Sequence, residues 1–128
     1  IPLTRLATRN SLPVSYFLST DKLSDVLEAT KVGGATLTSM LGTSAWYAPG
    51  AAVSALVHSI ACDQKKMFPC SALLEGEYGL SNISIGVPVI LGKAGIEKIV
   101  NLDLNDIEKE NLLQSAEAVM KTNGLLEG

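Results

Sequence analysis

The chain has 128 residues, of which 47% are hydrophobic and 18% charged, and it carries a formal net charge of −3 with a pI near 5.0. This composition is typical of a globular domain and excludes an intrinsically disordered chain. No cluster of Lys or Arg could neutralise a row of phosphates, which argues against nucleic-acid binding. No apolar run approaches the roughly 20 residues that a membrane-spanning helix needs.

The first third of the chain predicts a strand followed by a long helix. Residues 1–9 alternate loosely between apolar and polar and predict a strand, Asn10-Ser11 predicts a turn, and residues 12–14 a short extended piece. Apolar residues recur at helical spacing from Thr20 to position 41, and we expect Thr20 to cap this helix. Gly33-Gly34 predicts a bend or close packing within it, and Gly42 its end.

A second helix is predicted after the connection formed by residues 43–50. Thr43 or Ser44 could cap it, and Pro49 is compatible only with its start, where a missing N–H does least harm. The helix should extend through Ala61, because a wide apolar stripe begins at Ala52. That stripe consists of Ala52, Val53, Leu56, Val57 and Ile60.

The last half of the chain predicts three strands and a helix. Residues 67–75, 83–91 and 96–104 have strand character, and residues 92–95 should form a hairpin loop. Asn105 and Glu108 have the spacing of a capping box, and Asn123-Gly124 predicts a left-handed helix end. We expect this helix to bury Leu112, Leu113, Ala116, Val119 and Met120. The order of elements predicts an α+β fold, an antiparallel or mixed sheet with packed helices.

Motifs for nucleotide binding and catalysis are absent from this sequence. None of its 11 glycines forms the G-x-G-x-x-G turn of a Rossmann fold, a phosphate loop or a G-x-S-x-G nucleophile turn. The single histidine, His58, has no orienting carboxylate near it in sequence, so we interpret it as solvent-facing or as part of an interface. Arg5 and Arg9 could clamp a carboxylate, but ordinary surface positions explain them better.

The remaining titratable residues form no obvious site. Cys62 and Cys70 are too few for a disulfide framework and wrongly spaced for a zinc site, so we expect buried, free thiols in a reducing cytoplasm. Glu75, Glu77 and Asp103 fall on separate predicted strands and form no evident acid–base pair.

Four sequence blocks, in register, resemble the C-terminal domain of the lactate/malate dehydrogenase family. They are residues 41–52 (LGTSAWYAPGAA), 68–80 (FPCSALLEGEYGL), 85–92 (IGVPVILG) and 95–99 (GIEKI), and the opening IPL is similar to the segment after the family's catalytic histidine. The first block is of the malate type, although it has Gly42-Thr43-Ser44 where many relatives have an extra glycine. The resemblance covers essentially the whole chain.

This resemblance implies interconversion of malate and oxaloacetate with NAD. It also implies that the catalytic histidine, aspartate and arginines, together with the Rossmann domain that binds most of the NAD, lie upstream of Ile1. No catalytic residue is therefore assigned here. Ser44 and Ala45 match the stretch beside the substrate, and Pro49 matches the residue that packs on the nicotinamide ring.

Residues 1–128 are accordingly expected to form one substrate-side domain, cut from a longer cytoplasmic protein, since the chain starts at Ile1 directly in strand-like sequence. The helix over residues 50–61 matches a subunit contact in family oligomers, and a plain core helix explains its stripe equally well. We expect the isolated chain to be inactive and to self-associate through apolar surface. The alternatives are a lactate dehydrogenase C-terminal domain and a non-catalytic interaction module.

Overall fold

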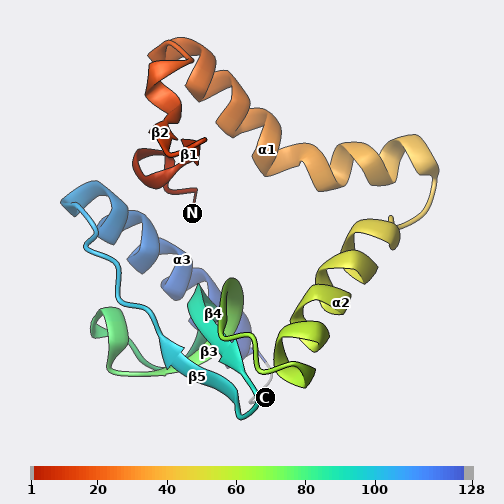
Figure 1. The fold of residues 1–128 in the computed structure, drawn as a ribbon. Helices are drawn as coiled ribbons and strands as arrows, with labels where there is room; N and C mark the ends of the chain where they lie inside the picture. The colour runs from red at the N-terminus through yellow and green to blue at the C-terminus, as the bar shows by residue number, and fades with distance from the viewer. Residues whose placement is uncertain (1, 126–128) are drawn as a thin grey trace. The chain divides into compact units, whose positions relative to one another are not determined.

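The computed structural model describes residues 2–125 (Figure 1). These residues form two compact units, residues 2–50 and residues 51–125. The first unit contains η1 (Thr4–Leu6), β1 (Thr8–Arg9), β2 (Leu12–Pro13), η2 (Val14–Tyr16) and α1 (Thr20–Leu41). The second contains most of α2 (Tyr47–Ala61), then β3 (Lys66–Glu75), η3 (Glu77–Gly79), β4 (Ser81–Gly92), β5 (Gly95–Ile99) and α3 (Asp106–Gly124). Each unit is described separately.

The N-terminal hairpin is much shorter than the strand predicted over residues 1–9: the prediction was wrong for residues 2–7 and right for Thr8 and Arg9, and Ile1 lies outside the described residues. The two turn residues, Asn10 and Ser11, both have positive φ (49° and 65°), as a tight two-residue hairpin turn requires. The turn pairs β1 with Leu12–Pro13. One more bond follows, from the Val14 N–H to the Ala7 carbonyl at 3.0 Å, and the chain then turns into η2 at Val14, so the strands stay short.

Helix α1 has the predicted extent but a different cap. The Ser19 hydroxyl, at 3.5 Å from the backbone nitrogen of Lys22, caps it, so the assignment of Thr20 as the cap was wrong. Gly42 ends the helix with φ 69°, as predicted. The helix axis bends near its middle (Figure 1), while a Cβ at Gly33 or Gly34 would meet nothing within 4 Å. The glycines therefore accompany a bend and not a close contact.

The unit over residues 51–125 is built on an antiparallel sheet in the order β3-β4-β5, which confirms the predicted α+β class. The β4–β5 hairpin turns between Gly92 and Gly95, as the sequence predicted. β4 alternates between buried and more exposed side chains, as expected when one face of a sheet packs against a core. Every buried hydrophobic side chain of the described residues belongs to this unit. They are Ala72, Leu74, Leu80, Ile83, Ile85, Val87, Val89, Leu91, Leu104, Leu112 and Ala116.

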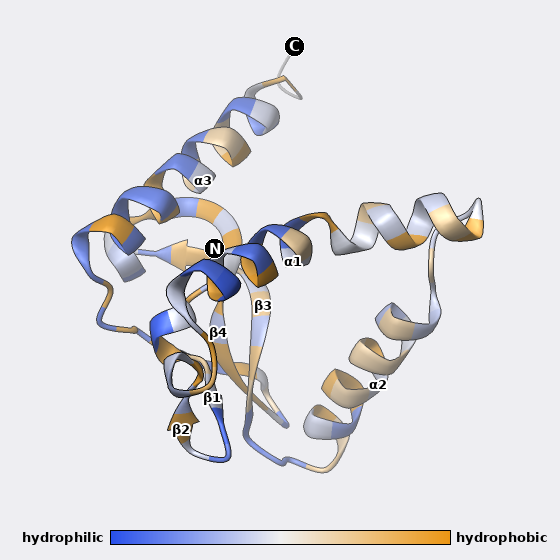
Figure 2. Cartoon of the chain, turned by 90° about the horizontal axis from the view of Figure 1, so that it is seen from above, coloured by the Kyte–Doolittle hydropathy of each residue, from blue (hydrophilic) through white to orange (hydrophobic). Residues whose placement is uncertain are grey.

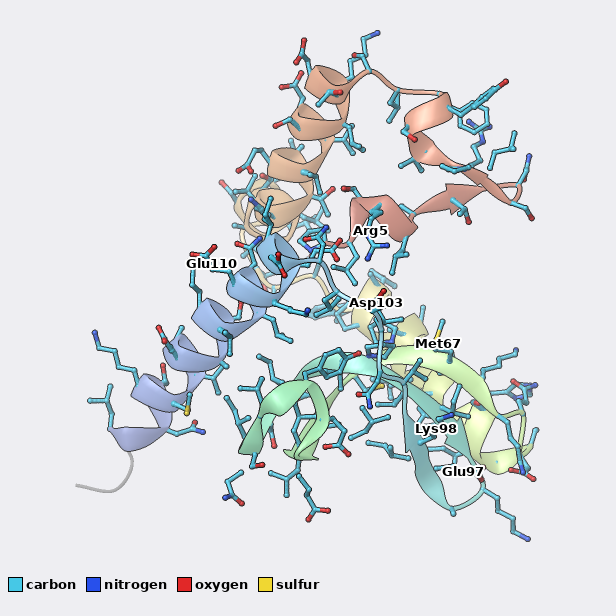
Figure 3. All side chains as sticks on the ribbon, turned by 90° about the vertical axis from the view of Figure 1, so that its left-hand side faces the viewer. Arg5, Met67, Glu97, Lys98, Asp103 and Glu110 are labelled. Atoms are coloured by element: carbon cyan, nitrogen blue, oxygen red, sulfur yellow. The ribbon has the colours of Figure 1, made fainter. Side chains whose placement is uncertain are left out.

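The two faces of the sheet differ in what covers them. α3 packs against β4 and contributes Leu112 and Ala116 to the buried face. On the other face, Met67 of β3 lies opposite Ile90 of β4, which in turn pairs with Lys98 of β5. Met67 and Lys98, both labelled in Figure 3, are exposed. The sheet thus offers one largely uncovered face within this unit.

Helix α3 confirms its predicted start and corrects its predicted end. The side chain of Asn105 accepts the Glu108 N–H, and the Glu108 carboxylate accepts the Asn105 N–H, both at 2.9 Å. Gly124 remains helical and the capping residue Leu125 has φ −76°, so the predicted left-handed end was wrong. Of the predicted buried face, Leu113 and Met120 are about half exposed and Val119 is intermediate.

The strand predicted over residues 96–104 ends at Ile99 because of Pro88 on β4. The Val100 N–H donates to the Pro88 carbonyl at 2.8 Å, but Pro88 has no N–H to return the bond. The Tyr78 hydroxyl replaces it by donating to the Val100 carbonyl at 2.5 Å, and it accepts the Leu102 N–H at 3.1 Å. The Tyr78 side chain thereby supplies the hydrogen bonds that the sheet no longer makes after Ile99, and it holds the segment that leads to α3.

We expect Tyr78→Phe to loosen this segment. The substitution leaves the Val100 carbonyl and the Leu102 N–H without their half-buried partner, at a cost of about 1–3 kcal/mol. Amide hydrogen exchange of Leu102 measures the effect directly, because its N–H is the donor. The control is Tyr47→Phe, since the Tyr47 side chain is 85% exposed. Equal Leu102 exchange in the Tyr78→Phe variant and the unmodified protein would contradict the assigned role of the hydroxyl.

Candidate functional site

The segment between α1 and α2, together with the first turn of α2, carries the three residues predicted to contact substrate and cofactor. Gly42 leaves α1 in the left-handed conformation, and residues 43–46 form an irregular connection to Tyr47. Ser44 is exposed and Ala45 is half-buried. Small side chains at both positions leave room beside the backbone.

Pro49 lies in the first turn of α2, as predicted, where the lack of an N–H costs no helical hydrogen bond. The first intrahelical bond runs from the Gly50 N–H to the Trp46 carbonyl at 2.8 Å. The helix therefore begins at Tyr47, and the proposal that Thr43 or Ser44 caps it was wrong. Pro49 itself is exposed and presents a rigid apolar ring.

Two aromatic residues next to Pro49 are exposed, a feature that the sequence analysis did not single out. Trp46 and Tyr47 are 66% and 85% exposed, and their ring centroids lie 6.4 Å apart. Large apolar rings on a surface are typical of places where another molecule or domain packs. Their position within the motif run was the available signal.

Residues 43–50 offer contact surface and carry no side chain with a formal charge. They contain hydroxyl groups, small side chains, a proline ring and two aromatic rings, and they contain no carboxylate, imidazole or amine. Such a segment can shape a pocket and orient a planar ring. The imidazole or carboxylate that most often transfers protons in enzymes would come from residues elsewhere.

His58 and the two cysteines form no catalytic arrangement. His58 is exposed in this chain, as expected for a residue that faces solvent or a partner, and its Nδ1 lies 3.8 Å from the Cys62 sulfur. Both cysteines are free, as predicted. The expectation that they are buried was wrong, since Cys62 is exposed and Cys70 is intermediate. Cys62 follows directly after the end of α2, which leaves its side chain open.

The charged residues considered from sequence have structural roles or surface positions. Arg5 and Arg9 are both exposed, and the Arg9 guanidinium lies 5.9 Å from the centre of the Phe17 ring. The Glu77 carboxylate accepts the backbone N–H of Glu75 at 2.7 Å. This bond, and a second one to its own backbone, hold the pKa of Glu77 below its ordinary value, while burial acts in the opposite direction. Glu77 therefore closes a turn.

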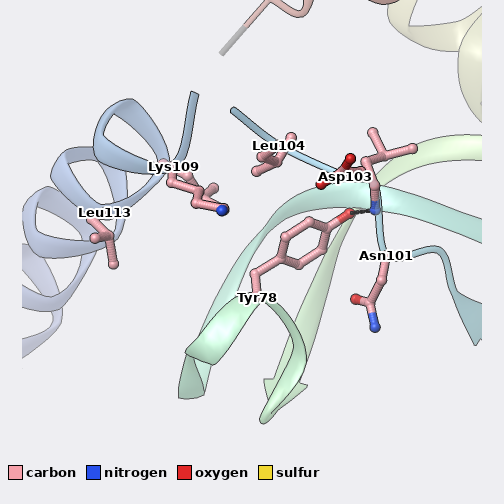
Figure 4. A pocket seen from close by; sticks show the side chains of 8 residues that line it. Tyr78, Asn101, Asp103, Leu104, Lys109 and Leu113 are labelled. Atoms are coloured by element: carbon pink, nitrogen blue, oxygen red, sulfur yellow. Dashed lines mark hydrogen bonds between the residues drawn. The ribbon is translucent and has the colours of Figure 1, made fainter. Parts of the chain in front are cut away.

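Each unit holds a cavity lined by described residues, and Ser44, Ala45 and Pro49 line neither of these. One of about 280 Å³ lies between α3 and the segment that follows β5; Figure 4 shows Lys109 and Leu113 on one side and Tyr78 on the other. The second, of about 250 Å³, lies in the unit over residues 2–50. Its lining residues are Pro2, Leu3, Thr4, Ala7, Val14, Leu18, Leu23, Val26, Leu27 and Thr30.

A metal centre is not formed by residues 2–125, where no group of three His, Cys, Asp or Glu side chains could hold an ion. Within the same residues, no helix combines the length and apolar character that crossing a membrane requires.

Comparison with known proteins gives a consistent picture. The chain matches the family described as lactate/malate dehydrogenase, alpha/beta C-terminal domain, over residues 5–123. The malate dehydrogenase of Bacteroides thetaiotaomicron is 65% identical over 126 residues, and that of Flavobacterium johnsoniae 61%; each match covers 98% of this chain and 40% of the relative. The chain thus spans about 40% of the length of these curated relatives.

Solved structures agree with the sequence relatives. A malate dehydrogenase from Salinibacter ruber matches with a TM-score of 0.97 and 39% identity, covering 99% of this chain and 42% of that one. A lactate dehydrogenase from Eimeria maxima, solved with NADH and oxamate, matches with a TM-score of 0.94 and 34% identity, covering 98% and 41%. The fold, the motif run around Pro49 and these matches lead to one conclusion: the chain belongs to the lactate/malate dehydrogenase family, as its alpha/beta C-terminal domain.

Proposed function

We propose that this chain is the substrate-side part of an NAD-dependent malate dehydrogenase, and that residues 1–128 form one C-terminal domain after a Rossmann domain. In the full-length protein, oxaloacetate, NADH and a proton would be converted to malate and NAD⁺, and the reverse. The observation that carries the proposal is the malate-type run over residues 41–52, in a chain whose relatives at 58–65% identity are named malate dehydrogenases.

The roles proposed for individual residues follow from their positions. Ser44 and Ala45 would line the substrate pocket, where their small side chains leave space for a dicarboxylate. The exposed proline ring of Pro49 fits packing against a flat nicotinamide ring, so that one face of the ring meets the substrate. NADH supplies the hydride when it is bound. Residues 43–50 hold no carboxylate, imidazole or amine, so the proton would come from the Rossmann side.

The assembly that we propose is a cytoplasmic homo-oligomer. α2 contains mostly hydrophobic residues (Figure 2), yet Val53 and Val57 are 57% and 58% exposed. Apolar side chains left open in this way favour an interface over a plain core helix. The uncovered face of the β3-β4-β5 sheet offers further surface for contact with the Rossmann domain.

Lactate dehydrogenase is the second candidate, because the Eimeria maxima lactate dehydrogenase shares this fold at 34% identity. Measuring oxidation of NADH by the full-length protein with oxaloacetate and with pyruvate separates the two. We expect kcat/KM for oxaloacetate to exceed that for pyruvate by about 100-fold or more, because a site built for a second carboxylate leaves polar groups unpaired with pyruvate. Preference for pyruvate would reassign the substrate, and the absence of both activities would favour a non-catalytic interaction module.

A further inference from the structure

Helix α2 is fixed to its unit by one buried polar side chain. Ser59 is fully buried at 0% exposure and is the only buried residue that α2 contains among those described. Its hydroxyl donates to the Leu91 carbonyl, near the end of β4, at 2.9 Å. A buried hydroxyl must find a partner or lose the free energy of its hydration, so this bond selects one orientation of the helix.

A second bond lies just beyond the end of α2. The Asp63 carboxylate accepts the N–H of Lys93, in the β4–β5 turn, at 2.8 Å. Gly92 makes this approach possible, because a Cβ there would lie 2.8 Å from Asp63 Oδ1 and closer still to the Glu97 carboxylate. Glu97, labelled on β5 in Figure 3, also pairs with Lys65 at 3.7 Å.

The two bonds together hold α2 more specifically than its apolar contacts do. The apolar side chains of α2 are exposed or intermediate, and contacts of that kind tolerate sliding and rotation. Hydrogen bonds from Ser59 and Asp63 to neighbouring residues of one hairpin define both the rotation of the helix about its axis and its position along that axis. We call these two bonds the α2 clasp.

We propose that Ser59 and Asp63 are positioning residues for hydride transfer, acting through α2 on Pro49. This inference rests on the function proposed above. Pro49 and Ser59 lie on one continuous helix, in its first and last turns. Ten residues at a rise of 1.5 Å place them about 15 Å apart along the axis, and a small rotation at Ser59 turns Pro49 with it. A misplacement of about 1 Å at a reacting ring can lower the rate up to about 100-fold.

The test uses the full-length protein with oxaloacetate and NADH. We expect Ser59→Ala and Asp63→Ala each to lower kcat about tenfold, with KM for NADH changed much less. Asp63→Asn should stay near the unmodified protein, because the amide oxygen still accepts the Lys93 N–H. NADH deuterated at the transferred position adds a sharper readout. Its isotope effect on kcat should rise in the two alanine variants, because hydride transfer then limits the rate more strongly.

Two controls separate positioning from loss of stability. Ser54→Ala makes the same change at an exposed position of α2 and should leave kcat and the isotope effect unchanged. Leu112→Val removes a buried methylene group from α3; it should lower the melting temperature without changing the isotope effect. Unchanged kcat in both alanine variants, or a lower kcat without a rise in the isotope effect, would overturn the proposal. Inactivity of the unmodified full-length protein would instead overturn the proposed function.

Discussion

The isolated 128-residue chain is expected to oxidise NADH with oxaloacetate no faster than buffer does. Under the proposed function residues 43–50 contact the substrate and the nicotinamide ring, but they hold no carboxylate, imidazole or amine. Proton transfer by a positioned side chain contributes roughly 10²–10⁴-fold to the rate of such reactions, and fixing the reactants next to each other contributes still more. A chain that provides one wall of a pocket loses both contributions, and the absorbance of NADH over time measures this directly.

The matched control is the full-length protein at the same molar concentration. Sedimentation of the isolated chain should be followed in parallel, because open apolar side chains such as Tyr47 (85% exposed) and Met40 (79%) favour self-association. A single monomeric species at high concentration would contradict that expectation. NADH oxidation that scales with the concentration of the isolated chain would show that residues 1–128 contain the reacting groups, and would refute the proposed division between the two domains.

The sequence predicted the ends of helices correctly where only one nearby residue was suited to the capping position. Gly42 ends α1 because a left-handed residue is needed there, and Asn105 with Glu108 caps α3 because their spacing satisfies two N–H groups. The cap of α1 was misplaced by one residue because Ser19 and Thr20 are both good caps, and the backbone decides between them. Gly124 has the residue type of a left-handed end, yet it continues the helix.

Contacts between distant residues were not predictable from a single sequence. Tyr78 bonds Val100 and Leu102, and Ser59 bonds Leu91 across 32 positions, and no periodic pattern encodes either pairing. The strand end at Ile99 follows from Pro88 on a neighbouring strand, so it needed the register of the sheet. Helical periodicity placed Leu113 on the apolar face of α3, but it could not show that Leu113 is 49% exposed, because exposure depends on what packs against that face.

The candidate site was predictable only as far as the motif run reached. Resemblance placed Ser44, Ala45 and Pro49 together, and the structure shows them on one short connection and the first turn of α2. The roles assigned to them remain proposals. The exposure of Trp46 and Tyr47 and the clasp at the far end of α2 came from the structure, because burial and hydrogen bonding depend on the packed chain.

Leu74→Ala is expected to destabilise the unit over residues 51–125 by about 2–5 kcal/mol. Leu74 lies near the end of β3 at 0% exposure, on the face of the sheet that is buried. Its pairing partner Ile83, at 1% exposure, and Ala72 two residues earlier share that face. Removing the leucine side chain loses its transfer free energy and leaves a cavity that a closely packed core fills only in part.

Leu73→Ala is the matched control, because the same substitution one position earlier acts on the opposite face of β3, where Leu73 is 56% exposed. Its cost should stay below about 1 kcal/mol, since half of its surface is already in water. Amide hydrogen exchange of β4 gives the free energy of opening for this unit alone, which a global melt of a two-unit chain would blur. An equal loss of opening free energy in the two variants would mean that both faces of the sheet are packed alike. A core on the α3 side of the sheet alone would then be the wrong description of this unit.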